Sequence, residues 1–97
     1  MKTFYTEYVH HCMRFYVKYP NPKYRSDADK HNWIACDTAL KSFSEADREL
    51  LLTLYTGNEP MAERIRKVST EQDVKADALW KMVTELERKI AKRRGLL

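Results

Sequence analysis

Three side chains that can bind a metal ion follow one another near the N-terminus, at His10, His11 and Cys12. Neighbouring residues of a helix point about 100° apart, so these three side chains cannot close on one ion. His31 and Cys36 are five positions apart and diverge in the same way. The pattern therefore predicts no metal site and no cofactor, and it indicates histidines that lie partly buried near aromatic rings.

Enzymatic chemistry has little support in the sequence. No GxSxG segment surrounds a serine nucleophile, and the two glycines, Gly57 and Gly95, are too far apart to build a phosphate-binding loop. Asp37, Asp47 and Glu63 are scattered along the chain without the pairing that general acid and base catalysis uses. We therefore expect no enzymatic activity and no small-molecule substrate.

Aromatic side chains gather in the first third of the chain. Eight of the eleven lie in residues 1–33, at Phe4, Tyr5, Tyr8, Phe15, Tyr16, Tyr19, Tyr24 and Trp33. One interpretation is a stacking platform for single-stranded nucleic acid, assisted by Arg14, Lys18, Lys23 and Arg25. Helical spacing instead favours an aromatic core between the first two helices, with an inward stripe at Phe4, Tyr8, Cys12, Phe15, Tyr16 and Tyr19. Tyr5 and Tyr24 are not part of that stripe, and we expect them to be exposed.

The elements that must position these residues are helices. A chain of 97 residues suits one domain, strict apolar/polar alternation is missing, and only two glycines and three prolines interrupt the sequence. We predict an all-α fold, a compact bundle of about five helices with a helix-turn-helix in the C-terminal half. The single domain, 1–97, combines an aromatic-rich two-helix part, 1–43, with a helix-turn-helix-like part, 44–97.

Capping residues and breakers set the expected helix bounds. The helices are expected over 3–19, from Ser26 to near Phe43, from Ser44 to Gly57, from Asn58 through Val68, and from about Val74 to Arg94. Two prolines within Tyr19–Tyr24 break the first helix, and Gly95 ends the last one. The polar segment Ser69–Asp73 is interpreted as a turn, although Ser69 with Gln72 also suits the start of a helix.

Basic charge is concentrated at the C-terminal end. Residues 1–43 carry seven Lys or Arg and four Asp or Glu, a net +3; residues 44–74 carry four and seven, a net −3; residues 75–97 carry seven and three, a net +4. No apolar run approaches the length of a membrane span, and the N-terminus lacks the features of a signal peptide. We expect a cytoplasmic protein without membrane contact, whose Cys12 and Cys36 are reduced, buried thiols.

The last three predicted helices follow in the order of a helix-turn-helix. The segments FSEADRELLLTLYTGNEPMAERIRKV and VKADALWKMVTELERKIAKRRGLL, roughly residues 43–96, resemble region 4 of bacterial sigma factors and the related small regulators of phages and mobile elements of Gram-positive bacteria. The resemblance rests on the entry Ser44–Leu51, on Glu63 and Ile65, on Val74 in the turn, and on Leu79–Trp80. The predicted turn is about three residues longer than the turn of that family and lacks its glycine.

This resemblance implies a transcription regulator whose last helix, about 74–94, lies in the major groove of double-stranded DNA. With Leu79, Val83, Leu86 and Ile90 facing the core, the outer face presents base-reading candidates at Lys75, Lys81, Thr84, Glu85 and Arg88. The candidates for phosphate contacts are Arg66, Lys67, Lys92, Arg93 and Arg94. Cations also stabilise the C-terminus of a helix directly, so the basic end has a structural role of its own.

A second interpretation keeps the fold without DNA binding. The acidic segment 44–74 repels phosphates, and the first helix leaves Tyr5 and Tyr24 outside its apolar stripe. An α-helical module for protein–protein interaction or dimerisation accounts for both features, with RNA polymerase or a second copy of the chain as the partner.

Overall fold

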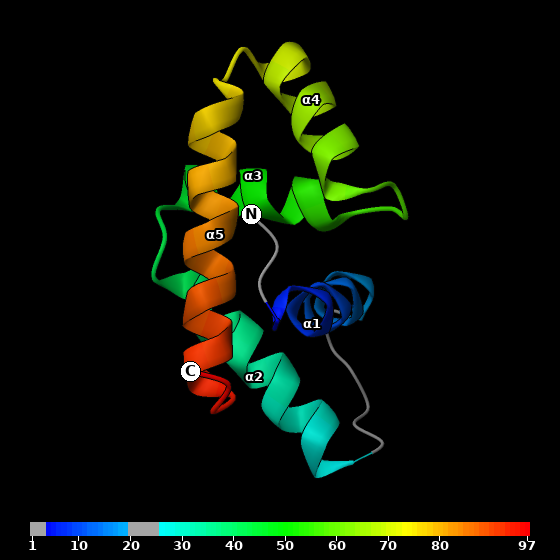
Figure 1. The fold of residues 1–97 in the computed structure, drawn as a ribbon, viewed down its shortest axis with the longest axis vertical. Coiled ribbons are helices and arrows are strands. Elements are labelled where there is room, and N and C mark those ends of the chain that lie inside the picture. The colour runs from blue at the N-terminus through cyan, green and yellow to red at the C-terminus, as the bar shows by residue number, and fades with distance from the viewer. Residues whose placement is uncertain (1–3, 20–25) are drawn as a thin grey trace.

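Five α-helices make up the part of the chain that the computed structural model describes, residues 4–19 and 26–97 (Figure 1). They are α1 (Thr6–Lys18), α2 (Asp27–Lys41), α3 (Glu45–Tyr55), α4 (Met61–Gln72) and α5 (Ala76–Arg93). No strand occurs in these residues, which confirms the predicted all-α class and the five helices. The prolines predicted to break the first helix, and Tyr24, lie outside the described residues.

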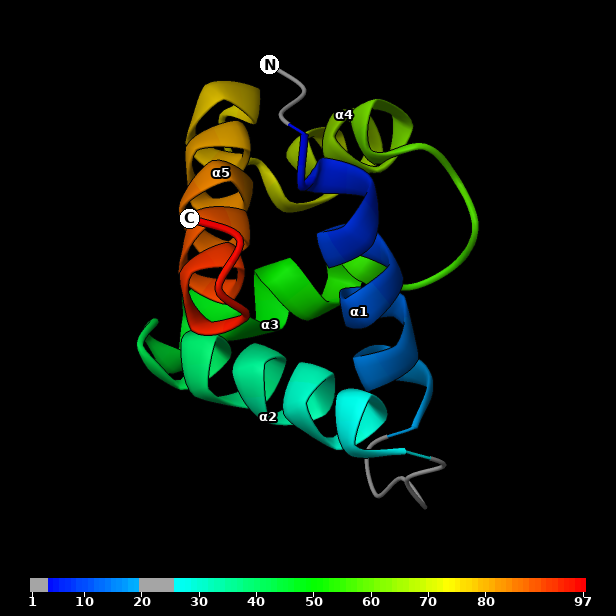
Figure 2. The same cartoon turned by 60° about the horizontal axis from the view of Figure 1, so that its bottom comes forward.

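Helix α5 is the element around which the others are arranged. It contacts each of α1, α2, α3 and α4. Figures 1 and 2 show that α2 crosses α5 near the C-terminal end of α5, and that α4 lies beside the N-terminal half of α5. The face predicted to be buried is buried: Leu79, Val83, Leu86 and Ile90 are each at most 2% exposed. Each such side chain stabilises the fold by roughly 1.5–3 kcal/mol when it leaves water.

Two of the three predicted N-caps are confirmed. The hydroxyl of Ser26 accepts a hydrogen bond from the backbone N–H of Asp29, and the hydroxyl of Ser44 accepts one from the backbone N–H of Asp47, both at 3.2 Å. The prediction that Asn58 caps the fourth helix was wrong. Pro60 occupies the N-cap position of α4, where its fixed φ of −56° leads directly into the helix without a side-chain cap.

The segment between α4 and α5 differs from the predicted turn. Ser69 to Gln72 continue α4, and the connection is the three residues from Asp73 to Lys75. Serine and threonine hydroxyls bond backbone carbonyls here, Thr70 to Arg66 at 3.1 Å and Ser69 to Val74 at 2.6 Å. These local bonds let a polar sequence remain helical and close its end. The polar composition was therefore a misleading signal of a turn.

Asp73 takes the conformation that a glycine usually supplies at the end of a helix. Its φ and ψ are 52° and 47°, in the left-handed region, and it is the only non-glycine with a positive φ among the described residues. The backbone N–H groups of Asp73 and Val74 both donate to the carbonyl of Ser69. Aspartate tolerates this conformation better than most residues do, so a short turn forms without glycine.

Helix α1 presents a different face to the core from the one predicted. Its buried side chains include Tyr5, Val9 and Met13, together with the correctly predicted Cys12. Phe4, Tyr8 and Tyr19 were predicted inside but are 80%, 39% and 45% exposed, whereas Tyr5, predicted exposed, is 8% exposed. Both stripes have helical spacing. The observed one buries the aliphatic Val9 and Met13, which have no hydroxyl to satisfy.

The remaining aromatic residues of α1 and α2 form a partly exposed layer. The rings of Tyr16 and Trp33 lie 4.9 Å apart, and the Tyr16 hydroxyl donates to Asp37 at 2.7 Å. The Tyr8 hydroxyl reaches Asn32 at 2.7 Å on the surface. Hydroxyl groups thus hold these rings at the boundary of the core, and the predicted aromatic core exists only in part.

The turn at Asp73 gives the first testable prediction. Asp73→Gly should raise the free energy of unfolding by up to about 1 kcal/mol, because glycine enters the left-handed region without a Cβ clash, and Asp73→Val should lower it by about 1–2 kcal/mol. Asp77→Gly, in the first turn of α5, is the control and should lower it, because glycine adds backbone freedom and the change removes a carboxylate that the helix N-terminus favours. Urea unfolding followed by circular dichroism measures all three. A destabilised Asp73→Gly would contradict the left-handed conformation.

A candidate nucleic-acid interface and an adjacent cleft

The five residues predicted to read bases all lie on the exposed surface of α5. Lys75 occupies the N-cap position, and Lys81, Thr84, Glu85 and Arg88 point away from the buried face. Lys81 and Arg88 are seven positions apart, so they lie two turns apart along the same side of the helix.

One of these five residues is engaged within the chain. Glu85 forms an ion pair at 3.6 Å with Lys89, which lies one turn further along the helix. The exposed face of α5 therefore combines cations with one carboxylate that is partly neutralised.

The two predicted phosphate contacts on α4 are paired with carboxylates. Arg66 forms an ion pair with Glu63, and the ammonium of Lys67 lies 2.6 Å from Glu59. The hydrogen bond from Lys67 lowers the pKa of Glu59, which Arg64 lowers further against the opposing effect of desolvation. Glu59 thus stays ionised and offsets the charge of Lys67. These two cations do not form a free positive patch.

The three predicted phosphate contacts at the end of α5 fall into two groups. Arg94 is half-buried, and its Nε donates to Asn32 at 2.6 Å, which ties the end of α5 to α2. Lys92 and Arg93 are exposed and line a shallow groove with Lys89 and the C-terminal part of α2. Six of the ten predicted site residues are exposed and form no ion pair with any residue that the structure describes: Lys75, Lys81, Thr84, Arg88, Lys92 and Arg93.

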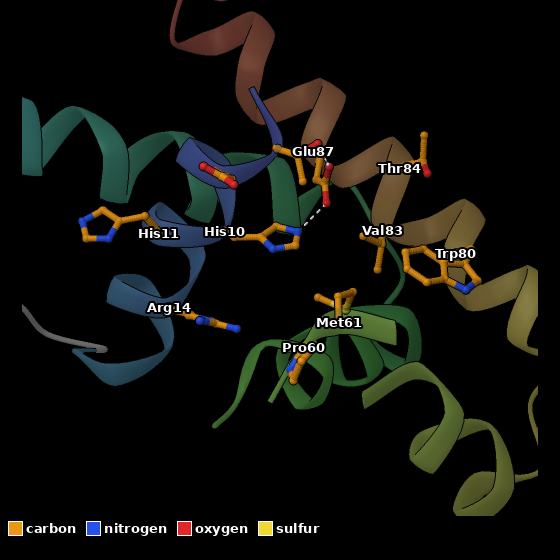
Figure 3. A pocket seen from close by; sticks show the side chains of 11 residues that line it. His10, His11, Arg14, Pro60, Met61, Trp80, Val83, Thr84 and Glu87 are labelled. Atoms are coloured by element: carbon orange, nitrogen blue, oxygen red, sulfur yellow. Dashed lines mark hydrogen bonds and ion pairs between the residues drawn. The ribbon is translucent and has the colours of Figure 1, made fainter. Parts of the chain in front are cut away.

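A cleft that the sequence did not predict opens between α1, the start of α4 and α5 (Figure 3). Its volume is about 510 Å³. The lining comes from one face of α1, two residues at the start of α4 and one side of α5: Thr6, Glu7, His10, His11, Arg14, Pro60, Met61, Trp80, Val83, Thr84 and Glu87. Segments up to 81 positions apart meet here, so local patterns carry no signal of the cleft.

Glu87 is a buried carboxylate at the edge of this cleft. It is 7% exposed, and its Oε1 lies 2.7 Å from Nε2 of His10, while Thr6 donates to Oε2 at 3.3 Å. The Tyr55 hydroxyl donates to Oε1 at 3.5 Å. Burial raises the pKa of Tyr55, and the nearby charge of Glu87 raises it further, so this hydroxyl remains a donor. The cluster joins α1, α3 and α5 through one carboxylate.

The two cysteine thiols, which could in principle act as nucleophiles, are unreactive in this fold. Cys12 and Cys36 are buried free thiols, as predicted, and burial raises the pKa of Cys12 to about 11 and that of Cys36 further. Neutral thiols of this kind are poor nucleophiles. The described residues contain no group of three or more His, Cys, Asp or Glu side chains that can hold a metal ion. No helix among them is long and apolar enough to span a membrane.

Comparison with protein-family models, with curated proteins and with solved structures finds no match to this chain. The function of the chain must therefore be inferred from the exposed face of α5 and from the cleft.

We predict that replacing Glu87 destabilises the fold much more than replacing Glu85 on the same helix. Glu87→Ala leaves His10, Thr6 and Tyr55 without their acceptor and should lower the free energy of unfolding by about 1.5–3 kcal/mol. Glu85→Ala removes an exposed carboxylate from the same helix and should change it by less than about 0.5 kcal/mol. Chemical unfolding of both variants at neutral pH measures the difference. Equal effects would show that the buried hydrogen bonds contribute nothing net.

Proposed function

We propose that the chain is a small DNA-binding transcription regulator of sigma-region-4 type, with the N-terminal half of α5 in the major groove of double-stranded DNA. The observation that supports it most is the three-residue connection between α4 and α5, from Asp73 to Lys75. A helix-turn-helix needs a turn of about 3–4 residues. Because α4 extends to Gln72, the connection in this chain has that length. Asp73 supplies the residue in the left-handed conformation, for which glycine is usual.

The spacing of the cations along α5 suits a major groove. Lys81 and Arg88 are separated by a rise of roughly 10 Å, which is close to the width of about 12 Å of the groove. Lys75 and Lys81 lie nearest to the helix N-terminus, where a recognition helix meets base edges. Lys92 lies roughly 6 Å beyond Arg88, at a suitable distance to meet a phosphate at the groove edge together with Arg93.

The composition of this face points to modest sequence discrimination. Lysine makes point contacts, whereas the bidentate contact with guanine is best made by arginine, and Arg88 is the one arginine of the proposed base-reading set. Glu85 has the chemistry to accept from the amino group of cytosine. Arg66 and Lys67 must first leave Glu63 and Glu59 before they can contact phosphates, so we place the phosphate contacts on Lys92 and Arg93.

A protein–protein interaction module is the second candidate, and one observation favours it. Phe4, just before α1, is 80% exposed and Tyr19, just after it, is 45% exposed, although Tyr5 is buried. Exposed aromatic rings are common at the centres of interfaces. Under this proposal the partner is a second copy of the chain, and Phe4→Ser should convert a dimer to a monomer in sedimentation equilibrium. A wild-type chain that sediments as a monomer at all concentrations excludes this second function.

DNA binding is tested by titrating duplex DNA at low salt and again near 200 mM salt. The wild-type chain should bind at low salt, and the affinity should fall steeply as phosphate neutralisation is lost. Changing Lys75, Lys81 and Arg88 together to alanine should remove most of the binding, because these residues make the proposed contacts with base edges. These residues are exposed, so the fold should persist.

The control for this experiment removes the same charge elsewhere. Changing Lys18, Lys30 and Lys41 together to alanine also lowers the formal charge by three, but on α1 and α2, and should leave most of the affinity. Equal losses in the two variants would mean that net charge, and not the face of α5, drives binding. Absence of binding by the wild-type chain at low salt would end the DNA proposal.

A further inference from the structure

The cleft between α1, α4 and α5 has the size of a site for a small organic molecule. Its volume of about 510 Å³ falls within the roughly 300–1,000 Å³ of typical ligand pockets. The lining divides into an apolar side, formed by Pro60, Met61, Trp80 and Val83, and a polar side to which α1 contributes most residues and α5 contributes Thr84 and Glu87. Figure 3 shows His10 and Arg14 extending from α1 toward this apolar side.

On the polar side, the buried acceptor is already engaged within the chain, whereas Arg14 has donors to offer. Glu87 receives hydrogen bonds within the chain from Thr6 and Tyr55 and lies in contact with His10. Arg14, by contrast, makes one hydrogen bond among the described residues, from Nη2 to the carbonyl of Glu59 at 3.2 Å. A guanidinium group has five N–H donors, so most of those of Arg14 remain available to a ligand.

The apolar side suits a flat, aromatic group. Trp80 is 39% exposed with its ring at the cleft, and Met61 lies across from it (Figure 3). Aromatic rings pack well against an indole face and against a thioether sulfur. The floor between them is Val83, which is 2% exposed.

We infer that this cleft binds a small aromatic monocarboxylate, with the carboxylate on the guanidinium of Arg14 and the ring between Trp80 and Met61. Arginine binds a carboxylate through two parallel hydrogen bonds, which fixes the orientation of the ligand as well as its charge. Glu7 and Glu87 also line the cleft, and their negative charge disfavours phosphates and other polyanions more strongly than a ligand with one negative charge. This site does not depend on the proposed DNA binding.

Two probes with the same ring and opposite charge test the site. Phenylacetate and phenethylamine are titrated, up to about 10 mM for such small ligands, into the full-length ¹⁵N-labelled chain. Phenylacetate should shift the indole N–H signal of Trp80 and the amide of Met61 in a saturable manner. Trp33 lies on α2 outside the cleft, so its indole signal should stay in place and serves as the internal reference.

Variants of two exposed cations on α1 provide the matched control. Arg14→Gln should weaken phenylacetate binding at least tenfold, whereas Lys18→Gln, which removes the same charge one turn further along, should leave it unchanged. Circular dichroism checks that both variants keep their helices.

Three outcomes overturn the inference. Tighter or equal binding of phenethylamine would mean that the carboxylates of the cleft, and not Arg14, select the ligand. Phenylacetate binding that survives Arg14→Gln would place the carboxylate elsewhere. If neither probe shifts Trp80, the cleft does not accept an aromatic ligand.

Discussion

The burial of one face of α5 is the constraint on which the rest of the structure depends. Leu79, Leu86 and Ile90 are fully buried, and α5 contacts all four of the other helices. Among the described helices α5 buries the most side chains, so the others pack where α5 is apolar. The remaining sides of α5 are then fixed. One faces solvent with Lys81 and Arg88, and another, with Trp80, forms a wall of the cleft.

The hydrogen bonds of Glu87 fix the orientation of α1 and α3 against α5, which apolar packing alone does not. A buried carboxylate is costly to desolvate, and its partners repay that cost only when their geometry is satisfied. His10 and Thr6 on α1, and Tyr55 on α3, meet Glu87 only when both helices hold their observed places against α5. The cluster therefore selects one arrangement of α1 among those that apolar contacts alone would tolerate. The same arrangement brings Arg14 over the cleft, so the polar cluster and the candidate ligand site have a common origin.

Sequence reasoning succeeded where the determining interactions are local. The caps at Ser26 and Ser44 bond three residues ahead, and the stripe from Leu79 to Ile90 is read from one helix. It failed where a local pattern had two solutions, as in α1, where packing against the other helices selected Val9 and Met13 over Phe4 and Tyr8. The partners of Glu87 lie 32 to 81 positions away, so its role has no signal in its neighbours.

The basic C-terminal end of α5 shows why the location of a charge matters more than its count. Arg94 holds α2 through Asn32, and Lys89 contacts Ser42 and lies 4.9 Å from the ring of Phe43. Both therefore serve the fold at a helix end where cations are stabilising in any case. Lys75, Lys81 and Arg88 have no such structural reason to be cationic. Lys75 even stands at the N-terminus of α5, where the helix dipole disfavours a positive charge, so an anionic partner would relieve an unfavourable interaction there.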